Sequence, residues 1–247
     1  MIRGLYAGAS GMVAEAIRTD VIANNLANVN TAGYKKDIPV NKEFANVLIT
    51  RINDGRNSAG IGSVGSGVMI DGVATIQSGG VMRSTGNDFD LAIAGKGFFT
   101  VETPQGVRYT RNGTFARNTQ GELITQDGYR VLGQNGPLRI KGGKMVVNDD
   151  GRVLVDNAPI GKLQLVEFDN EKQLIKEGAS LFAPLPGQNG KLATGGVRQG
   201  ILEMSNVNVI GEMVNLISSY RTYEINGKVV QSHDQLMGKA ANEVGRL

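Results

Sequence analysis

The sequence has no cysteine and no tryptophan, and its 247 residues include one histidine and six prolines. Without cysteine the chain forms no disulfide and no thiolate metal site. One imidazole, that of His233, cannot build a metal site, and no serine is placed beside it as a nucleophile by any recognisable pattern. We therefore predict no catalytic residue, no metal ligand and no cofactor, and a protein that is not an enzyme.

The sequence also has little excess of one charge over the other, because 26 Lys and Arg are balanced by 23 Asp and Glu, which gives a formal net charge of +3. Such a small surplus does not indicate nucleic acid as a partner. No apolar run approaches the roughly 20 residues of a membrane helix, so we expect no membrane insertion. The residues after Met1 do not form the apolar core of a secretory signal, and we expect export, if any, without a cleaved signal peptide.

Two short motifs are interpreted as structural. Gly60, Gly62 and Gly65 match the glycine spacing of a dinucleotide-binding turn, but no predicted strand precedes them and no predicted helix follows. They are interpreted as part of an extended connector. The basic pair Lys35 and Lys36 beside Tyr34 is interpreted as a solvated edge.

The middle of the chain carries the turn and strand signals. All six prolines lie between positions 39 and 186, and glycine after a polar residue recurs at short steps, which favours hairpin turns. The turn glycines are Gly106, Gly113, Gly121, Gly128 and Gly136. Segments rich in β-branched and aromatic residues separate the turns and predict antiparallel strands. They are Phe98 to Val101, Val107 to Thr110, Leu123 to Thr125, Tyr129 to Leu132, Met145 to Val147, Val153 to Val155 and Leu163 to Phe168.

Both ends of the chain have the spacing of helices, with apolar residues at alternating steps of three and four. The N-terminal seam is Ile2, Leu5, Ala9, Met12, Ala16, Thr19, Ala23 and Leu26. The C-terminal seam is Val209, Met213, Leu216, Tyr220, Tyr223, Gly227, Val230, Asp234, Met237, Ala241 and Val244. Asn208 can cap the second helix, which would be about 55 Å long.

The predicted fold class is therefore α+β, with N- and C-terminal helices around a central all-β domain of antiparallel strands and glycine-rich turns. The predicted parts are an N-terminal helical arm (1–40), an extended connector (41–80), a central β-domain (81–200) and a C-terminal helical arm (201–247). Asparagines between Asn24 and Asn30 precede Gly33, which can adopt the left-handed conformation that closes a helix. They are either a cap and turn, or a packing or recognition motif.

Three motifs in order resemble the bacterial flagellar rod and hook axial protein family. The first is Asn24-Asn25-Leu26-Ala27-Asn28 with Thr31-Ala32-Gly33-Tyr34. The second comprises Gly95-Lys96-Gly97-Phe98-Phe99 and Tyr109-Thr110-Arg111-Asn112-Gly113-Thr114-Phe115. The third is Leu202-Glu203-Met204-Ser205-Asn206-Val207-Asn208, followed by Glu212-Met213 and Arg221-Thr222-Tyr223-Glu224.

The resemblance implies a structural subunit of the flagellar basal-body rod, in which the terminal helices form a coiled-coil layer. It implies unfolded export by the flagellar type III apparatus, without a cleaved signal peptide. In the periplasm the subunit would polymerise helically, with itself and with other rod and hook proteins, into the drive shaft that transmits torque to the hook. The short chain resembles a rod protein more than a hook protein, and the proximal and distal subtypes both stay open.

The expected assembly interface combines the two seams with the asparagines of the motifs. Its residues are Leu5, Met12, Asn24, Asn25, Leu26, Asn28, Asn206, Asn208, Met213, Leu216, Tyr220 and Tyr223. One alternative is a hook or hook-associated axial subunit. Outside the family, a β-domain binding module oligomerised by its coiled coil is the next interpretation, and an enzyme acting on peptidoglycan is the third.

Leu216→Asp is predicted to abolish assembly, because it buries a charge in the C-terminal seam, while the β-domain stays folded. The amount of assembled rod in cells that carry the variant measures the effect. An unchanged amount would contradict the assignment of the seam.

Overall fold

The computed structural model describes residues 2–44, 46–50 and 60–244, which form two compact units. The first, the helical unit, contains Met1–Leu26, Asp37–Ala74 and Val209–Leu247. The second, the β-unit, contains Ala27–Lys36 and Thr75–Asn208. The division of the sequence into four consecutive parts stays a prediction, because these units follow contacts and not chain order.

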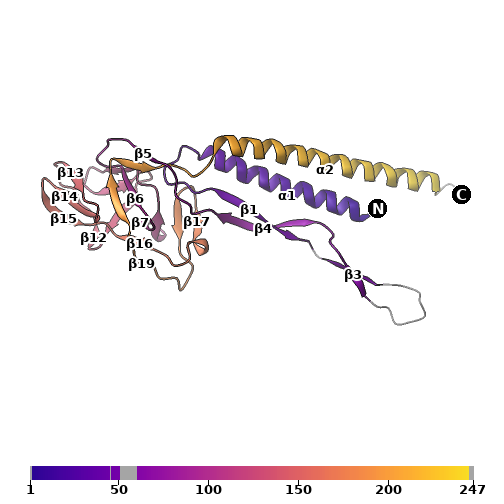
Figure 1. Cartoon of the computed structure of the whole chain (residues 1–247), viewed down its shortest axis with the longest axis horizontal. Helices are drawn as coiled ribbons and strands as arrows, with labels where there is room; N and C mark the ends of the chain where they lie inside the picture. The colour runs from indigo at the N-terminus through magenta and orange to yellow at the C-terminus, as the bar shows by residue number, and fades with distance from the viewer. Residues whose placement is uncertain (1, 45, 51–59, 245–247) are drawn as a thin grey trace. The chain divides into compact units, whose positions relative to one another are not determined.

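The helical unit is built on two long helices that run antiparallel, side by side (Figure 1). Helix α2 begins directly after Asn208, as the sequence predicts. The connector predicted as extended (41–80) contains three strands, β2, β3 and β4, and the end of a fourth, β1; β1 pairs with β4, and β2 is antiparallel to β3. The elements are α1 (Ile2–Ala27), β1 (Asp37–Glu43), β2 (Val47–Thr50), β3 (Gly60–Val64), β4 (Val68–Thr75) and α2 (Val209–Val244).

The β-unit consists of antiparallel strands in several sheets. The largest sheet has the path β17-β18-β8-β7-β11-β10-β9, while β16 pairs with β7 and β19. Smaller sheets are β13-β14-β15, β6 with β20 and β5 with β21. The elements are β5 (Met82–Ser84), β6 (Leu91–Ala94), β7 (Phe98–Thr103), β8 (Gly106–Thr110), β9 (Phe115–Arg117), β10 (Leu123–Thr125), β11 (Arg130–Gly133), β12 (Gly136–Pro137), β13 (Met145–Val147), β14 (Arg152–Val155), β15 (Ala158–Lys162), β16 (Leu165–Glu167), the 3₁₀ turn η1 (Glu171–Gln173), β17 (Ile175–Glu177), β18 (Leu181–Ala183), β19 (Lys191–Leu192), β20 (Gly196–Gln199) and β21 (Ile201–Glu203). All seven strands predicted from the sequence are present.

The predicted turn glycines behave in two ways. Gly106, Gly121, Gly128 and Gly136 have positive φ, as hairpin turns require. Gly113 does not. Instead its carbonyl accepts the Leu91 N–H, and a Cβ at this position would overlap the Leu91 carbonyl. Gly113 is thus required for a close approach of two backbones and not for a turn.

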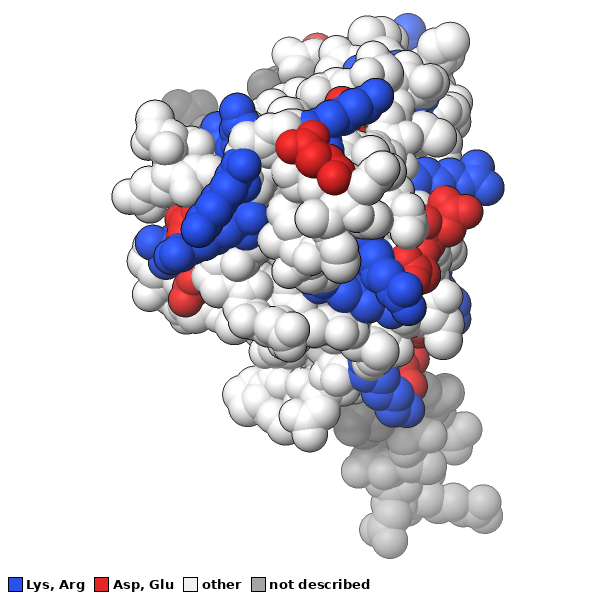
Figure 2. Space-filling model, turned by 90° about the vertical axis from the view of Figure 1, so that its left-hand side faces the viewer, with Lys and Arg blue, Asp and Glu red and all other residues white. Residues whose placement is uncertain are grey.

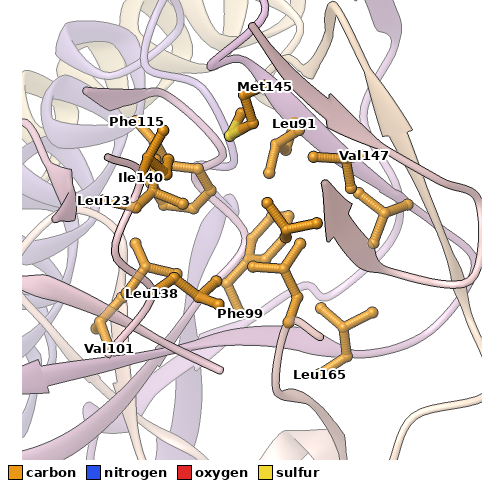
Figure 3. Packing of buried hydrophobic residues seen from close by; sticks show 14 of the residues in the cluster. Leu91, Phe99, Val101, Phe115, Leu123, Leu138, Ile140, Met145, Val147 and Leu165 are labelled. Atoms are coloured by element: carbon orange, nitrogen blue, oxygen red, sulfur yellow. The ribbon is translucent and has the colours of Figure 1, made fainter. Parts of the chain in front are cut away.

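The main core of the β-unit gathers inward-facing residues from most of its strands (Figure 3). The rings of Phe99 and Phe115 pack edge to face, with centroids 5.1 Å apart. A second cluster forms around Phe98, Phe168 and Phe182. Strand β7 supplies both clusters, because neighbouring residues Phe98 and Phe99 point to opposite faces of the sheet.

The charged surface agrees with the near balance of acids and bases in the sequence. On the face drawn in Figure 2, Lys and Arg side chains form several separate groups with Asp and Glu side chains beside them. This face carries no continuous field of one sign.

Gly33 has the predicted left-handed conformation, with φ of 67°, but a different role from the predicted one. Helix α1 already ends at Ala27, so Gly33 does not close it. A Cβ on Gly33 would overlap the backbone of Arg111 and Asn112, and the Gly33 N–H donates to the Glu203 carbonyl at 2.7 Å. Gly33 therefore lets the segment after α1 pack directly on the backbone of Arg111 and Asn112 within the β-unit.

Gly33→Ala is expected to destabilise the β-unit by more than about 3 kcal/mol, because it adds a backbone clash to the cost of a left-handed residue. Gly128→Ala is the matched control, since Gly128 also has positive φ but has nothing near its missing Cβ. The control should cost about 1–2 kcal/mol. Urea denaturation followed by fluorescence or circular dichroism compares the two, and equal losses would show that the close approach is unimportant.

Candidate assembly interface

The two helices meet along glycines of α1. A Cβ on Gly4, Gly8 or Gly11 would lie within about 3 Å of α2 side chains, those of His233, Val230 and Asn226 respectively. Glycine is therefore the residue that allows the helices to approach this closely. The imidazole of His233, interpreted from sequence as a surface or interface side chain, packs over Gly4.

The contact face of α1 differs from the predicted seam. The seam positions Ala9, Ala16 and Ala23 are exposed in the chain, whereas Gly8 and Ile22 are buried. Part of the contact face thus lies one position earlier than predicted, while the seam positions Met12 and Thr19 also contact α2. A pattern of apolar side chains does not indicate positions at which the contact depends on having no side chain.

Polar groups complete the contact between the helices. The Ser219 hydroxyl donates to Glu15 Oε2 at 2.6 Å and lies 3.1 Å from the Thr19 hydroxyl. Buried Asn25 donates through Nδ2 to the Asp37 carbonyl at 2.8 Å and to Glu212 Oε2 at 3.4 Å, while its Oδ1 accepts the Asp37 N–H. The Asn25 amide therefore joins α1, α2 and β1 within one chain.

Over the first turns of α2, the side that faces away from α1 is apolar and open to solvent. Ile210 is 77% exposed, Val214 61%, Ile217 55% and Tyr220 60%, and Met213 lies among them at 48%. We call these five residues the apolar stripe. They follow the helical repeat over almost three turns, so they form one face of α2. The stripe has no cover within the part of the helical unit that the structure describes.

The predicted interface residues are distributed over several environments. Met213, Tyr220, Tyr223, Asn24 and Asn208 are exposed, and Asn25 is buried. The remaining six are partly buried: Leu5, Met12, Leu26, Asn28, Asn206 and Leu216. Exposed Met213 and Tyr220 belong to the stripe, while Leu216 is flanked by it.

A buried ion cluster in the β-unit joins the segment after α1 to the strand that precedes α2. Glu203, 2% exposed, accepts the Lys35 ammonium through Oε1 at 2.5 Å and faces Arg111 through Oε2 at 3.4 Å. Lys35 also donates to the Ser78 carbonyl at 2.8 Å, and the Gly80 N–H donates to Glu203 Oε1. We call Lys35, Arg111 and Glu203 the ion cluster.

Electrostatics in the ion cluster are governed by burial. Removal from water lowers the pKa of Lys35 and of Arg111, and the Glu203 carboxylate acts in the opposite direction on both. The interpretation of Lys35 as a solvated edge is therefore wrong, because Lys35 is only 1% exposed. The residues next to Lys35 in the sequence give no sign of this burial, because its partner Glu203 lies 168 residues further along.

Asn206 secures the same junction through its side-chain amide. Its Oδ1 accepts the Lys36 N–H at 2.7 Å, and its Nδ2 donates to the Ile76 and Ser78 carbonyls. The ammonium of Lys176 lies over the Tyr34 ring and donates to the Lys35 carbonyl. The residues that directly follow the first sequence motif are thus held to a residue of the third motif inside one chain.

Among the residues that the structure describes, His, Asp and Glu form no group that could hold a metal ion. Within that same part of the chain, neither helix has the length and apolar character needed to cross a membrane.

Three family models match the chain in the order of its motifs. Residues 5–35 match "Flagella basal body rod protein", residues 92–158 match "Flagellar hook protein FlgE/F/G D1 domain", and residues 198–243 match "Flagellar basal body rod FlgEFG protein C-terminal". The chain is 35% identical to the flagellar basal-body rod protein FlgG of Bacillus subtilis, over 98% of this chain and 99% of that protein. The chain belongs to the flagellar basal-body rod protein family.

Two further relatives extend the match. The FlgG protein of Borreliella burgdorferi is 37% identical over 98% of each chain, and the FlgF rod protein of Caulobacter vibrioides is 35% identical over the whole of both. The family places this structural rod subunit in the flagellar basal body. Each residue of the ion cluster comes from a different matched segment, so the cluster ties together the three parts that define the family.

Glu203→Leu is expected to destabilise the β-unit by about 3–5 kcal/mol, because it leaves two buried cations without their carboxylate. Glu177→Leu is the control, since Glu177 pairs with Arg108 at 2.6 Å but is 42% exposed, and it should cost at most about 1 kcal/mol. Chemical denaturation of the purified variants measures both. Similar losses in the two would show that burial of the cluster does not set its importance.

Proposed function

We propose that the chain polymerises helically through its terminal helices, with itself and with other rod and hook proteins. The polymer forms the periplasmic drive shaft that transmits torque to the hook, and the chain has no catalytic role in it. The type III apparatus exports the chain unfolded and without a cleaved signal peptide. The apolar stripe on α2 is the observation that carries this proposal.

Solvent exposure of the stripe is unfavourable for an isolated chain. Full burial of one Val, Leu or Ile side chain contributes roughly 1.5–3 kcal/mol, and the stripe presents five large apolar side chains side by side. A contiguous apolar face on a surface helix marks a site of association. In the proposed assembly a neighbouring subunit covers the apolar stripe.

Open-ended assembly also needs a second, different surface. Helix α1 exposes Tyr6 at 64% and Val13 at 61%, apart from its contact face with α2. A stripe on one helix that meets a different patch on the next subunit is a heterologous contact, and such contacts extend into helical filaments when they do not close into rings.

The long helices suit a shaft. The glycine contact draws α1 and α2 close together, and α2 is about 54 Å long at about 1.5 Å per residue. A closely packed helix pair resists bending and twisting better than separate helices, because interior packing is dense and not readily compressed.

The alternative of a hook or hook-associated subunit uses the same surfaces, and the position of the protein along purified flagella distinguishes it. A binding module held together by a coiled coil would instead form a discrete oligomer whose size does not grow with concentration.

Ile217→Asp tests the proposal more cleanly than a change at Leu216, since Leu216 is partly buried within the chain and Ile217 is 55% exposed. The variant should lose assembly, measured by sedimentation and electron microscopy of the purified chain, while its helix content and β-unit stability stay unchanged. Gln231→Asp places the same carboxylate at an exposed polar position of α2 and should assemble normally. Filaments formed by Ile217→Asp at the wild-type concentration would refute the role of the stripe.

A further inference from the structure

A cavity of about 340 Å³ opens in the β-unit, and no residue of α1 or α2 is among those that line it. One wall is segment 75–78, and the other is segment 168–172, which includes the start of the turn η1. Lys96, in the turn between β6 and β7, lies at the rim.

Three buried side-chain atoms of this cavity have no hydrogen-bond partner among the described residues. Both amide atoms of Gln77, Oε1 and Nε2, are buried without a hydrogen bond to any described residue, and so is Oε1 of Glu171. Buried polar groups in folded proteins are nearly always satisfied. By contrast, the carbonyls of Ile76 and Ser78, on either side of Gln77, both accept a hydrogen bond from the Asn206 amide.

Two lysines line the cavity, and together with Lys191 they outnumber the acids Asp169 and Glu171 by three to two. Lys96 and Lys172 are exposed, and neither forms an ion pair with a described residue. Asp169, the exposed acid of the same wall, forms an ion pair with Lys191, with Nζ 2.7 Å from Oδ2. The outer part of the cavity therefore attracts an anionic group.

We propose that this cavity binds an extended peptide segment with an acidic side chain. A carboxamide presents one donor and one acceptor side by side, which matches the N–H and C=O of a peptide backbone. Rotation of the Gln77 side chain turns its amide toward the cavity that it lines, and Glu171 Oε1 accepts a further backbone N–H. The acidic side chain reaches Lys96 and Lys172.

A glycan fits the cavity less well. Sugar rings pack on exposed aromatic faces, and the only aromatic residue of the lining, Phe168, is 2% exposed and belongs to the core. The peptide site goes beyond the proposed assembly through the helices, because it uses β-unit residues alone and is tested on the unassembled chain.

The test is a titration of the full chain, kept below its assembly concentration, followed by NMR of backbone and Gln side-chain amides. The probe is a blocked pentapeptide of alternating glycine and glutamate. We expect saturable shifts at Gln77 and Glu171, at least about tenfold weaker binding to Gln77→Met, and weaker binding to the Lys96→Ala, Lys172→Ala double variant. Gln120→Met and Lys141→Ala, at exposed positions on other loops, should bind like the wild type.

A stability readout separates binding from structure. Gln77→Met removes an unpaired buried amide, so its melting temperature should be unchanged or higher while its binding falls. Absence of saturable shifts, equal binding by Gln77→Met, or equal binding of a glycine and lysine pentapeptide would overturn the proposal. Saturable shifts at these residues with a tetramer of N-acetylglucosamine, and none with the peptide, would replace it with a glycan site.

Discussion

The Glu203 carboxylate holds two buried cations that come from distant parts of the chain. Lys35 follows α1, Arg111 follows β8, and Glu203 ends β21, shortly before α2. None of the three could be buried alone, since an unpaired ion in the interior is strongly unfavourable. The path by which the chain enters and leaves the β-unit is therefore fixed by the condition that all three charges be satisfied together.

The same condition explains the glycines and amides around the cluster. Gly33 must lie on the Arg111 backbone for its N–H to reach the Glu203 carbonyl, and Asn206 must bridge Lys36 to segment 76–78. In the helical unit the Asn25 side chain likewise bridges Asp37 and Glu212 by hydrogen bonds. The sequence alone does not decide whether the asparagines of the motifs are caps or recognition residues. In the structure at least two of them, Asn25 and Asn206, form side-chain hydrogen bonds within the chain.

Local signals carried the sequence-based predictions furthest. Strands bounded by glycine turns, such as β7 and β8, were predictable because the hairpin partner is adjacent and the alternation of side chains is visible. The pairs β6 with β20 and β5 with β21 were not, since their partners lie more than 100 residues away. For the same reason Lys35 was predicted to be solvated, because nothing near it in the sequence resembles a counter-ion.

Helix contacts were predicted less well for a different reason. Periodicity located both helices, but it ranked positions by apolar side chains, so it chose Ala9 and Ala16 and not Gly4, Gly8 and Gly11. The prediction for Gly113 was wrong for the same reason: Gly113 was predicted to form a turn, but it allows a close approach to the Leu91 backbone. A glycine that is needed for the space it leaves has no signature in hydrophobic pattern, and only the partner surface shows why it is there.

Polar and apolar groups thus act at different levels of this molecule. The ion cluster, Asn25 and Asn206 find their partners within one chain, where they specify a single arrangement of its segments. The surface left over on α2 is apolar, and covering it with a neighbour removes no ion from water. In the proposed assembly the free energy of each contact then comes mainly from apolar area, while the geometry of that contact is inherited from polar groups already satisfied inside each subunit.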